Sequence, residues 1–234
     1  MDLKDTELFL ILFKVRNILG MIYWYKYLLR KAKKISDLIV ACDDARILEC
    51  VQGFGGKAVM TRKNHPNGSS RVAEAVSHED AQIVINIQGD EPLIRPEGID
   101  QLVDALIQNP DIPAATLTVR KTGREEYENP NVVKIVTDAS GNALYFSRAP
   151  VPHFRDEKKS FSFLKHLGIY GYRKIFLLQF IKWDSGALED TEKLEQLRIL
   201  ERGCKIRVIE TAHDSYSVDT AEDLERVIAE MKKE

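Results

Sequence analysis

Short apolar runs with the length of β-strands recur along this chain of 234 residues, and helical patterns separate the early runs. Strand-like runs lie at 8–13, 37–42, 57–60, 83–87, 114–119, 132–136, 143–147, 166–172 and 205–210. Helical patterns lie near 22–33, 45–54, 70–76 and 96–108. Strands that alternate with helices form βαβ units, in which the strands are parallel and the helices cover them. The sequence therefore predicts an α/β fold with a mostly parallel central sheet flanked by helices.

The pattern changes between about 119 and 172, where strands and loops contain several prolines. Proline interrupts regular elements, so this part favours an antiparallel extension of the sheet over further βαβ units. Helical patterns return at 191–203 and 220–233. We expect a single domain over residues 1–234, with a smaller lobe around 119–195.

The charge balance argues against binding to nucleic acid or to an anionic membrane. Lys and Arg total 34 against 36 acids, which gives a net charge of −2. Such a chain has no overall electrostatic attraction to phosphate-rich partners. Its cysteines, Cys42, Cys50 and Cys204, are too few and too scattered for a disulfide framework or a zinc cluster. We expect a reduced, cytoplasmic protein.

The apolar run at 8–13 could suggest a signal peptide or a membrane anchor, but its surroundings favour neither. A signal peptide needs a basic segment before its apolar run, whereas Asp2, Asp5 and Glu7 precede this one. Charged residues also interrupt the apolar stretch 8–29, which makes it unsuited to span a bilayer. We therefore interpret the run as a buried strand and expect no membrane association.

Two adjacent acids, Asp90 and Glu91, follow the apolar run "IVINI" in the sequence "IVINIQGDEP". Ligands of open α/β sheets bind beyond the carboxyl ends of the strands, where this sequence delivers Asp90. Gly89 permits close backbone approach, and Pro92 stops the strand. A carboxylate there could hold Mg²⁺ together with phosphate oxygens and water. An ordinary polar turn after a strand remains the alternative.

A second acid, Asp219, comes from far along the chain, directly before the predicted C-terminal helix in "SVDTAEDLERV". Asp219 or Thr220 could be the N-cap of that helix. Alternatively, Asp219 is the second ligand of a metal held by Asp90. The sequence alone leaves both interpretations open.

Eight stretches of the chain, in order from about residue 35 to the end, resemble the CMP-Kdo synthetases, which are 3-deoxy-manno-octulosonate cytidylyltransferases of lipopolysaccharide synthesis. They are "LIVACDDARI", "HPNGSSRVAE", "VINIQGDEP", "NVVKIV", "ALYFSRAPVP", "LKHLGIYGYRK", "LEQLRILERG" and "VDTAEDLERV". The resemblance implies a Rossmann-like nucleotidyltransferase fold whose smaller antiparallel lobe binds the sugar and forms a homodimer. It also implies Mg²⁺-dependent transfer of CMP from CTP to 3-deoxy-manno-octulosonic acid (Kdo).

The resemblance also implies a role for particular residues. Asp90 and Asp219 would bind Mg²⁺, and Lys14 stands near the place of a catalytic lysine. The nucleotide would meet Ala41, Cys42, Asp43, Arg71, Gln88 and Gly89, although the family usually has threonine where this chain has Cys42. Kdo would meet Arg148, His166, Tyr170, Glu195 and Gln196.

Each sugar-side residue also has a purely structural interpretation. A guanidinium such as that of Arg148 suits a carboxylate because it can donate two parallel hydrogen bonds. Glu195 and Gln196 could hold several hydroxyls. Conversely, Tyr170 could belong to the core, His166 could be a satisfied histidine on a strand, and "LEQLRIL" could be a plain amphipathic helix.

The N-terminus departs from the family pattern. The resembling enzymes carry an Ala-Arg-x-Gly-Ser-x-Arg loop that binds the triphosphate, and its Gly-Ser-x-Arg part is missing from "LFLILFKVRNILGMIYW". Lys14 and Arg16 could partly replace the lost cations, or the chain could turn over poorly, which we favour. Two further alternatives are another sugar-acid cytidylyltransferase, such as a CMP-sialic acid synthetase, and a binding protein that kept the fold without the reaction.

Overall fold

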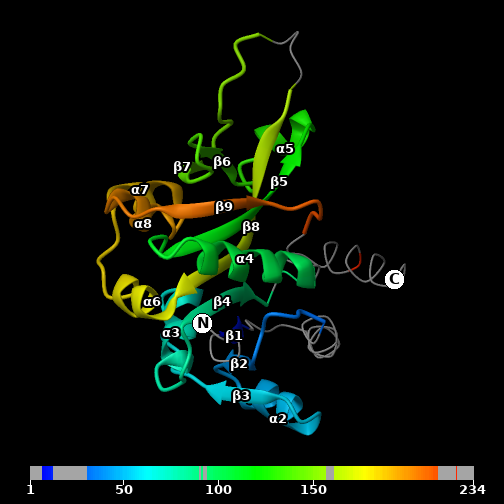
Figure 1. Ribbon diagram of the computed structural model, residues 1–234, viewed down its shortest axis with the longest axis vertical. Helices are drawn as coiled ribbons and strands as arrows, with labels where there is room; N and C mark the ends of the chain where they lie inside the picture. The colour runs from blue at the N-terminus through cyan, green and yellow to red at the C-terminus, as the bar shows by residue number, and fades with distance from the viewer. Residues whose placement is uncertain are drawn as a thin grey trace.

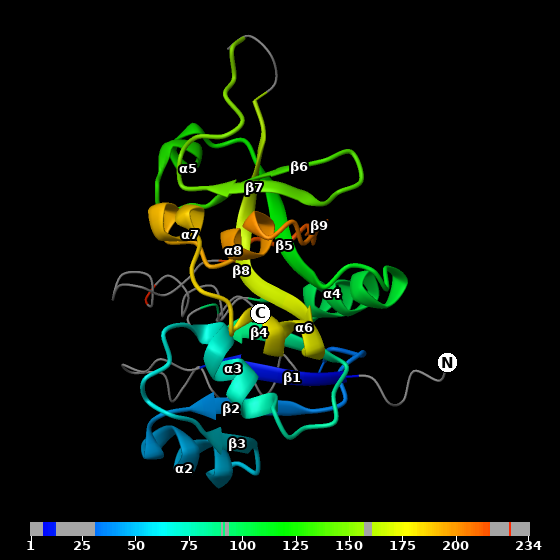
Figure 2. The same ribbon diagram turned by 90° about the vertical axis from the view of Figure 1, so that its left-hand side faces the viewer.

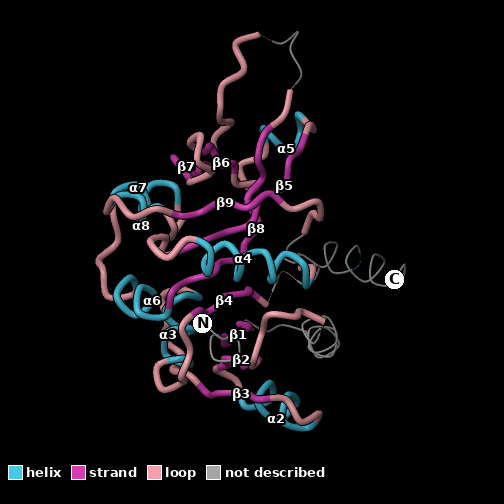
Figure 3. Tube along the Cα trace, in the orientation of Figure 1, coloured by secondary structure: helices cyan, strands magenta, loops and turns pink. Residues whose placement is uncertain are grey.

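The structure, a computed structural model, describes residues 7–12, 31–89, 91, 94–156, 161–215 and 225; of 7–12 it describes the backbone. The strands in this part are β1 (Glu7–Leu12), β2 (Leu38–Cys42), β3 (Lys57–Met60), β4 (Ile83–Gln88), β5 (Ala114–Lys121), β6 (Lys134–Thr137), β7 (Ala143–Ser147), β8 (Phe163–Arg173) and β9 (Ile206–Glu210). The helices are α2 (Ala45–Gly53), α3 (Gly68–Val76), α4 (Pro96–Gln108), α5 (Arg124–Glu128), α6 (Lys174–Phe180), α7 (Ala187–Glu192) and α8 (Leu197–Glu201). Helices and strands alternate from β2 to β5, as predicted (Figure 3).

The central sheet has the strand order β3-β2-β1-β4-β8-β5-β9. β1, β2, β3 and β4 are mutually parallel, and β5 is parallel to β9. β8 runs antiparallel to both of its neighbours, β4 and β5. The prediction of a mostly parallel sheet flanked by helices is therefore confirmed, with β8 as the inserted antiparallel strand.

A smaller antiparallel lobe extends the sheet. β6 pairs antiparallel with β7 and with the first part of β8, so that β8 belongs to both the lobe and the central sheet. Figures 1 and 2 show β8 rising from the sheet toward β6 and β7. Tyr127 anchors the lobe because its ring contacts Phe154, Phe161 and Phe163. The predicted antiparallel extension is confirmed, whereas its part in a dimer and the domain bounds stay predictions.

Apolar residues cover both faces of the central sheet. Ile85 and Ile87 of β4 belong to the same core cluster as Leu102 of α4. Val84, which points to the opposite face, belongs to a second cluster with Val72 of α3. α3 and α6 lie in front of the sheet in Figure 2. This two-sided burial explains why the run "IVINI" does not alternate with polar residues.

One predicted helix is wrong in a way that matters for the site. The predicted helix at 191–203 is interrupted: it contains the end of α7 and all of α8, and between them Lys193 adopts a left-handed conformation with φ of 54°. The break turns Leu194 into the core, where it is buried. Glu195 and Gln196 consequently lie in the turn before α8 and not on one continuous helical face.

Two other predictions fall partly outside the described residues. Residues 31–33, the end of the helix predicted at 22–33, form turn and loop, and the rest of that helix lies outside. The C-terminal helix predicted at 220–233 lies outside as well, apart from helical Glu225. Within the described residues, no helix has the length and apolar character that crossing a membrane requires.

Candidate functional site

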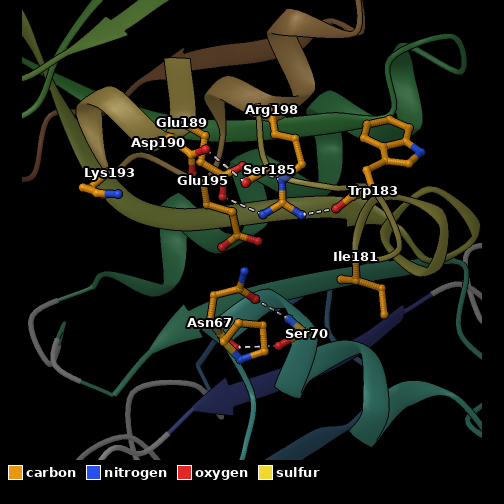
Figure 4. Close-up of a pocket in the computed structure, with 11 residues that line it drawn as sticks. Asn67, Ser70, Ile181, Trp183, Ser185, Glu189, Asp190, Lys193, Glu195 and Arg198 are labelled. Atoms are coloured by element: carbon orange, nitrogen blue, oxygen red, sulfur yellow. Dashed lines mark hydrogen bonds and ion pairs between the residues drawn. The ribbon is translucent and has the colours of Figure 1, made fainter. Parts of the chain in front are cut away.

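A cleft of about 450 Å³ separates the start of α3 from the segment that carries α7 and α8. Figure 4 shows Asn67 and Ser70 on one side, facing Glu195, Arg198 and Trp183 on the other. The lining residues are Pro66, Asn67, Ser70, Ile181, Trp183, Ser185, Glu189, Asp190, Lys193, Glu195 and Arg198. Most of its lining residues are polar or charged, and one of them is the predicted sugar-side residue Glu195.

The start of α3 is held by a capping hydrogen bond, and the side chain of Gln88 packs closely against it. The Asn67 side-chain oxygen accepts a hydrogen bond from the Ser70 backbone N–H at 2.9 Å, which satisfies one of the free donors of the first turn. Gly68 follows, and a Cβ atom on it would lie 2.6 Å from Nε2 of Gln88. A larger residue here would have to displace the Gln88 side chain, which lies directly against the helix start.

Three hydrogen bonds connect Gln88, at the end of β4, to Glu195 in the turn before α8. Nε2 of Gln88 donates to Oδ1 of Asn86 at 2.9 Å, and Nδ2 of Asn86 donates to Oγ of Ser69 at 3.4 Å. Oγ of Ser69 in turn donates to Oε2 of Glu195 at 3.2 Å. The structure thus links a predicted nucleotide-side residue to a predicted sugar-side residue.

Glu195 is a carboxyl group placed where it titrates near neutral pH. Burial raises its pKa to about 7, although the Ser69 hydrogen bond and the charge of Arg198 lower it. Arg198 is itself engaged in a two-pronged ion pair with Glu189, with N–O distances of 2.5 and 2.6 Å. The second oxygen of Glu195, Oε1, is buried and has no hydrogen-bond partner among the described residues. A buried oxygen without a partner is costly, so this atom is suited to receive a ligand hydroxyl.

His166 and Tyr170 lie together on β8, with ring centroids 5.2 Å apart. Nε2 of His166 is 3.0 Å from the hydroxyl of Thr116. Burial lowers the pKa of His166 to about 3, and burial also raises the pKa of Tyr170, an effect to which the charge of Glu195 contributes. Both side chains are therefore neutral at ordinary pH. The structure brings His166, Tyr170 and Glu195 into one neighbourhood.

Arg148 follows β7 and makes contacts that hold this strand to α7. Its Nε donates to the Glu192 carbonyl at 2.8 Å and its Nη1 to the Pro130 carbonyl at 3.1 Å. Its backbone N–H donates to the Glu192 carboxylate at 2.9 Å. Its role toward a substrate carboxylate stays a prediction. So does the role of Gln196, which is buried at the start of α8.

The predicted nucleotide-side residues lie at the ends of β2 and β4. Ala41 and Cys42 are fully buried, and burial raises the pKa of the Cys42 thiol; their role toward a nucleotide stays a prediction. Arg71 of α3 is also buried; its Nη2 pairs with the Asp43 carboxylate at 2.6 Å and its Nη1 donates to the Thr61 hydroxyl at 2.9 Å. The structure therefore brings Arg71 and Asp43 together as an ion pair.

The predicted metal ligands Asp90 and Asp219 and the predicted catalytic Lys14 lie outside the described residues. The residues beside the two acids are described. Oγ of Ser215 donates to Oε2 of Glu91 at 2.6 Å, which joins the loop after β4 to the chain after β9. Asp214 is held by Lys121 at 2.7 Å and Lys165 at 2.8 Å.

Two carboxylates suit Mg²⁺, which takes hard oxygen ligands and keeps several waters. Within the described residues, no group of three or more His, Cys, Asp or Glu side chains is arranged to hold a metal ion. The magnesium prediction therefore depends on Asp90 and Asp219 and stays a prediction.

Several site residues were not predicted from the sequence, chiefly Ser69, Asn86 and the Glu91–Ser215 pair. Asn86 carried a signal, because an amide inside an apolar strand must find a hydrogen-bond partner when the strand is buried. Ser69 and Ser215 carried none, since a serine in a loop or a helix start is common and its partner is far away in the sequence.

Comparison with known proteins adds the family. Residues 17–206 match the family model described as cytidylyltransferase. The 3-deoxy-manno-octulosonate cytidylyltransferase of Geobacter sulfurreducens is 49% identical over 212 residues, covering 86% of this chain and 85% of the relative. The enzyme of the same name from Fusobacterium nucleatum is 46% identical over 214 residues, covering 91% and 86%.

Solved structures agree with the sequence relatives. CMP:2-keto-3-deoxy-manno-octonic acid synthetase complexed with CTP matches with a TM-score of 0.91 and 36% identity, covering 97% of this chain and 99% of that structure. The 4-diphosphocytidyl-2C-methyl-D-erythritol synthase of Anaerococcus prevotii has a TM-score of 0.65 at 12% identity, which shows a shared fold alone. With close relatives over most of its length, this chain belongs to the 3-deoxy-manno-octulosonate cytidylyltransferases, a family of nucleotidyltransferase enzymes.

Proposed function

We propose that this enzyme transfers CMP from CTP to Kdo, giving CMP-Kdo and pyrophosphate for lipopolysaccharide biosynthesis. The observation that carries the proposal is the position of Glu195 in the cleft. Its buried Oε1 has no partner among the described residues, and three hydrogen bonds link its other oxygen to the amide of Gln88 on the nucleotide side. A sugar acid offers several hydroxyls to such a group. The relatives named for this reaction supply the identity of the sugar.

The reaction needs positioning more than covalent chemistry. The anomeric hydroxyl of Kdo attacks the α-phosphorus of CTP in line, and pyrophosphate leaves. Holding two reactants in attack geometry can supply several kcal/mol of the barrier. Glu195 and the neutral His166 and Tyr170 would orient the sugar through hydrogen bonds, and Arg148 would meet its carboxylate. Gln88 and the Arg71–Asp43 ion pair would form the nucleotide side.

Asp90 and Asp219 would hold Mg²⁺, and a bound Mg²⁺ neutralises charge on the phosphate oxygens and on the departing pyrophosphate. The described contacts that favour this site are the Ser215–Glu91 hydrogen bond and the two lysines on Asp214, because they fix the chain on both sides. Lys14 would add a cation toward the phosphates.

We also propose that the enzyme is a cytoplasmic homodimer whose contact involves the smaller lobe. Leu144 on β7 supports a contact there, since 62% of its surface is exposed and an apolar side chain of this size gains from being covered. The family resemblance supports the same arrangement.

Pyrophosphate release from CTP and Kdo with Mg²⁺ tests the proposal, with the Asp90→Ala variant as the comparison. We expect release from the parent chain and its loss in the variant, whereas N-acetylneuraminic acid in place of Kdo should give none. Release with N-acetylneuraminic acid alone would move the enzyme to another sugar-acid class. A folded parent that binds CTP without releasing pyrophosphate would indicate a chain that lost the reaction with its N-terminal phosphate loop.

A further inference from the structure

We propose that Ser69 and Asn86 are positioning residues that couple nucleotide binding to sugar binding, through the hydrogen-bond chain that runs from Gln88 to Glu195. The inference rests on the proposed function and deepens it. It gives a role in coupling the two binding sites to two residues that need not contact either substrate.

All three donors in this hydrogen-bond chain point the same way, from Gln88 toward Glu195. The Gln88 amide donates to the Asn86 carbonyl oxygen, the Asn86 amide donates to the Ser69 hydroxyl oxygen, and the Ser69 hydroxyl donates to the Glu195 carboxylate. Each bond polarises the next when all donors point the same way. The negative end is Glu195, so its charge state is felt along the whole chain.

The two central members are shielded from water. Asn86 is 1% exposed and Ser69 is 2% exposed. In such surroundings hydrogen bonds are stronger than at the surface, and a broken one leaves a buried polar group without a partner. The bonds of this hydrogen-bond chain therefore change together, because water cannot replace one that is lost.

Each end of this hydrogen-bond chain lies where a ligand could act on it. At the sugar end, Oε1 of Glu195 has no partner among the described residues, so a substrate hydroxyl that donates to it withdraws charge from Oε2 and weakens the Ser69 bond. At the nucleotide end, Gln88 lies directly against Gly68, so a shift of its amide also moves the start of α3.

The hydrogen-bond chain also connects three separate elements of the fold. Gln88 and Asn86 lie on β4 of the central sheet, Ser69 is in the first turn of α3, and Glu195 precedes α8. Coupling between two binding sites is reciprocal. If the sugar changes the affinity for nucleotide by some factor, nucleotide must change the affinity for the sugar by the same factor. Loss of the Ser69 hydroxyl should remove that mutual effect while both pockets remain.

Isothermal titration with the unreactive α,β-methylene analogue of CTP, with Mg²⁺ and with or without saturating Kdo, tests this inference. In the parent we expect Kdo to change the Kd of the analogue by at least about fivefold, which is a usual size for coupling between sites. In Ser69→Ala we expect this coupling factor to fall below about twofold, whatever change the loss of the Glu195 bond makes to the affinity for Kdo alone. Ser69→Thr keeps the hydroxyl and should restore coupling.

Ser77→Ala, at the other end of α3, is the matched control and should couple as the parent does. If Ser69→Ala does not fold, Ser69→Cys, with its weak donor, replaces it. Coupling that persists unchanged in Ser69→Ala, or that is absent from the parent, would overturn the inference. A parent that binds and couples both ligands yet releases no pyrophosphate from CTP would sink the proposed function and leave this inference standing.

Discussion

Ser215 and Glu91 are 124 positions apart in the sequence, yet the serine hydroxyl donates to the glutamate carboxylate at 2.6 Å. The bond joins the loop that follows β4 to the segment that follows β9, and each of these carries one acid predicted to bind Mg²⁺. Gly168 leaves room for it, since a Cβ atom there would lie 3.0 Å from Oε1 of Glu91.

Ser215→Ala should raise the Mg²⁺ concentration for half-maximal pyrophosphate release by roughly tenfold. The expected size follows from the loss of a hydrogen bond to a charged group, worth about 1.5–3 kcal/mol. Magnesium titrations at saturating CTP and Kdo would measure it. Ser140→Ala, an exposed serine in the β6–β7 turn, should leave the titration unchanged. An unaltered magnesium dependence in Ser215→Ala would show that the bond has no part in holding the metal.

Glu195→Gln should make the free protein less sensitive to alkaline pH. The folded pKa of Glu195 is about 7 against an ordinary 4.5, so its contribution to stability is complete below pH 4.5 and is lost as pH rises through 7. The variant cannot ionise and should gain about 3 kcal/mol relative to the parent at pH 8, since the folded and ordinary pKa values differ by about 2.5 at 1.36 kcal/mol per pKa unit.

Urea unfolding of both proteins at pH 5 and pH 8 would test this, with Glu125→Gln on the exposed side of α5 as the control. Equal stability differences at the two pH values would mean that Glu195 is ionised in the folded protein well below neutrality.

His166→Gln should flatten the loss of stability in mild acid. The folded pKa of His166 is about 3 against an ordinary 6.5, so its contribution is complete above pH 6.5 and is lost as pH falls toward 3. Glutamine cannot take up a proton and can still hydrogen-bond Thr116. Chemical denaturation between pH 7 and 4.5 should therefore show a steeper decline for the parent. Parallel curves for the two proteins would place the histidine pKa near its ordinary value.

Gly68→Ala should raise the KM for CTP by about tenfold, because the new methyl group would lie 2.6 Å from Nε2 of Gln88 and must displace it; tenfold corresponds to about 1.4 kcal/mol. Gly53→Ala is a matched control at the end of α2, where an added Cβ meets nothing within 4 Å. Steady-state kinetics of the two variants would compare them. A normal KM for CTP in Gly68→Ala would show that the Gln88 side chain is not held in place for the nucleotide.

The elements were easier to predict than their arrangement. The apolar run of β4 and the proline-led helix α4 depend on nearby residues, and both were found. The insertion of β8 between β4 and β5 was not, since the partners of a strand are decided by residues far away in the sequence. The break at Lys193 was also missed, because "LEQLRIL" keeps a helical pattern of apolar residues across it.

The site residues show the same contrast between what the sequence could predict and what it could not. His166, Tyr170 and Glu195 were predicted through family resemblance, and the structure brings them together. Ser69 and Ser215 were missed because each forms its important hydrogen bond with a residue more than a hundred positions away. No local pattern contains such a pair.

The position of β5 has a consequence for the synthesis of the chain. Both of its neighbours in the sheet, β8 and β9, come later in the sequence, and β9 ends at Glu210. A ribosome working at about 5–20 residues per second therefore leaves at least one edge of this apolar strand unpaired for roughly 5–20 seconds, until its second partner exists. Pairings between distant segments are also slow to form. We expect the yield of this enzyme in a cell to depend on how well that strand is shielded during translation, more than on the stability of the finished fold.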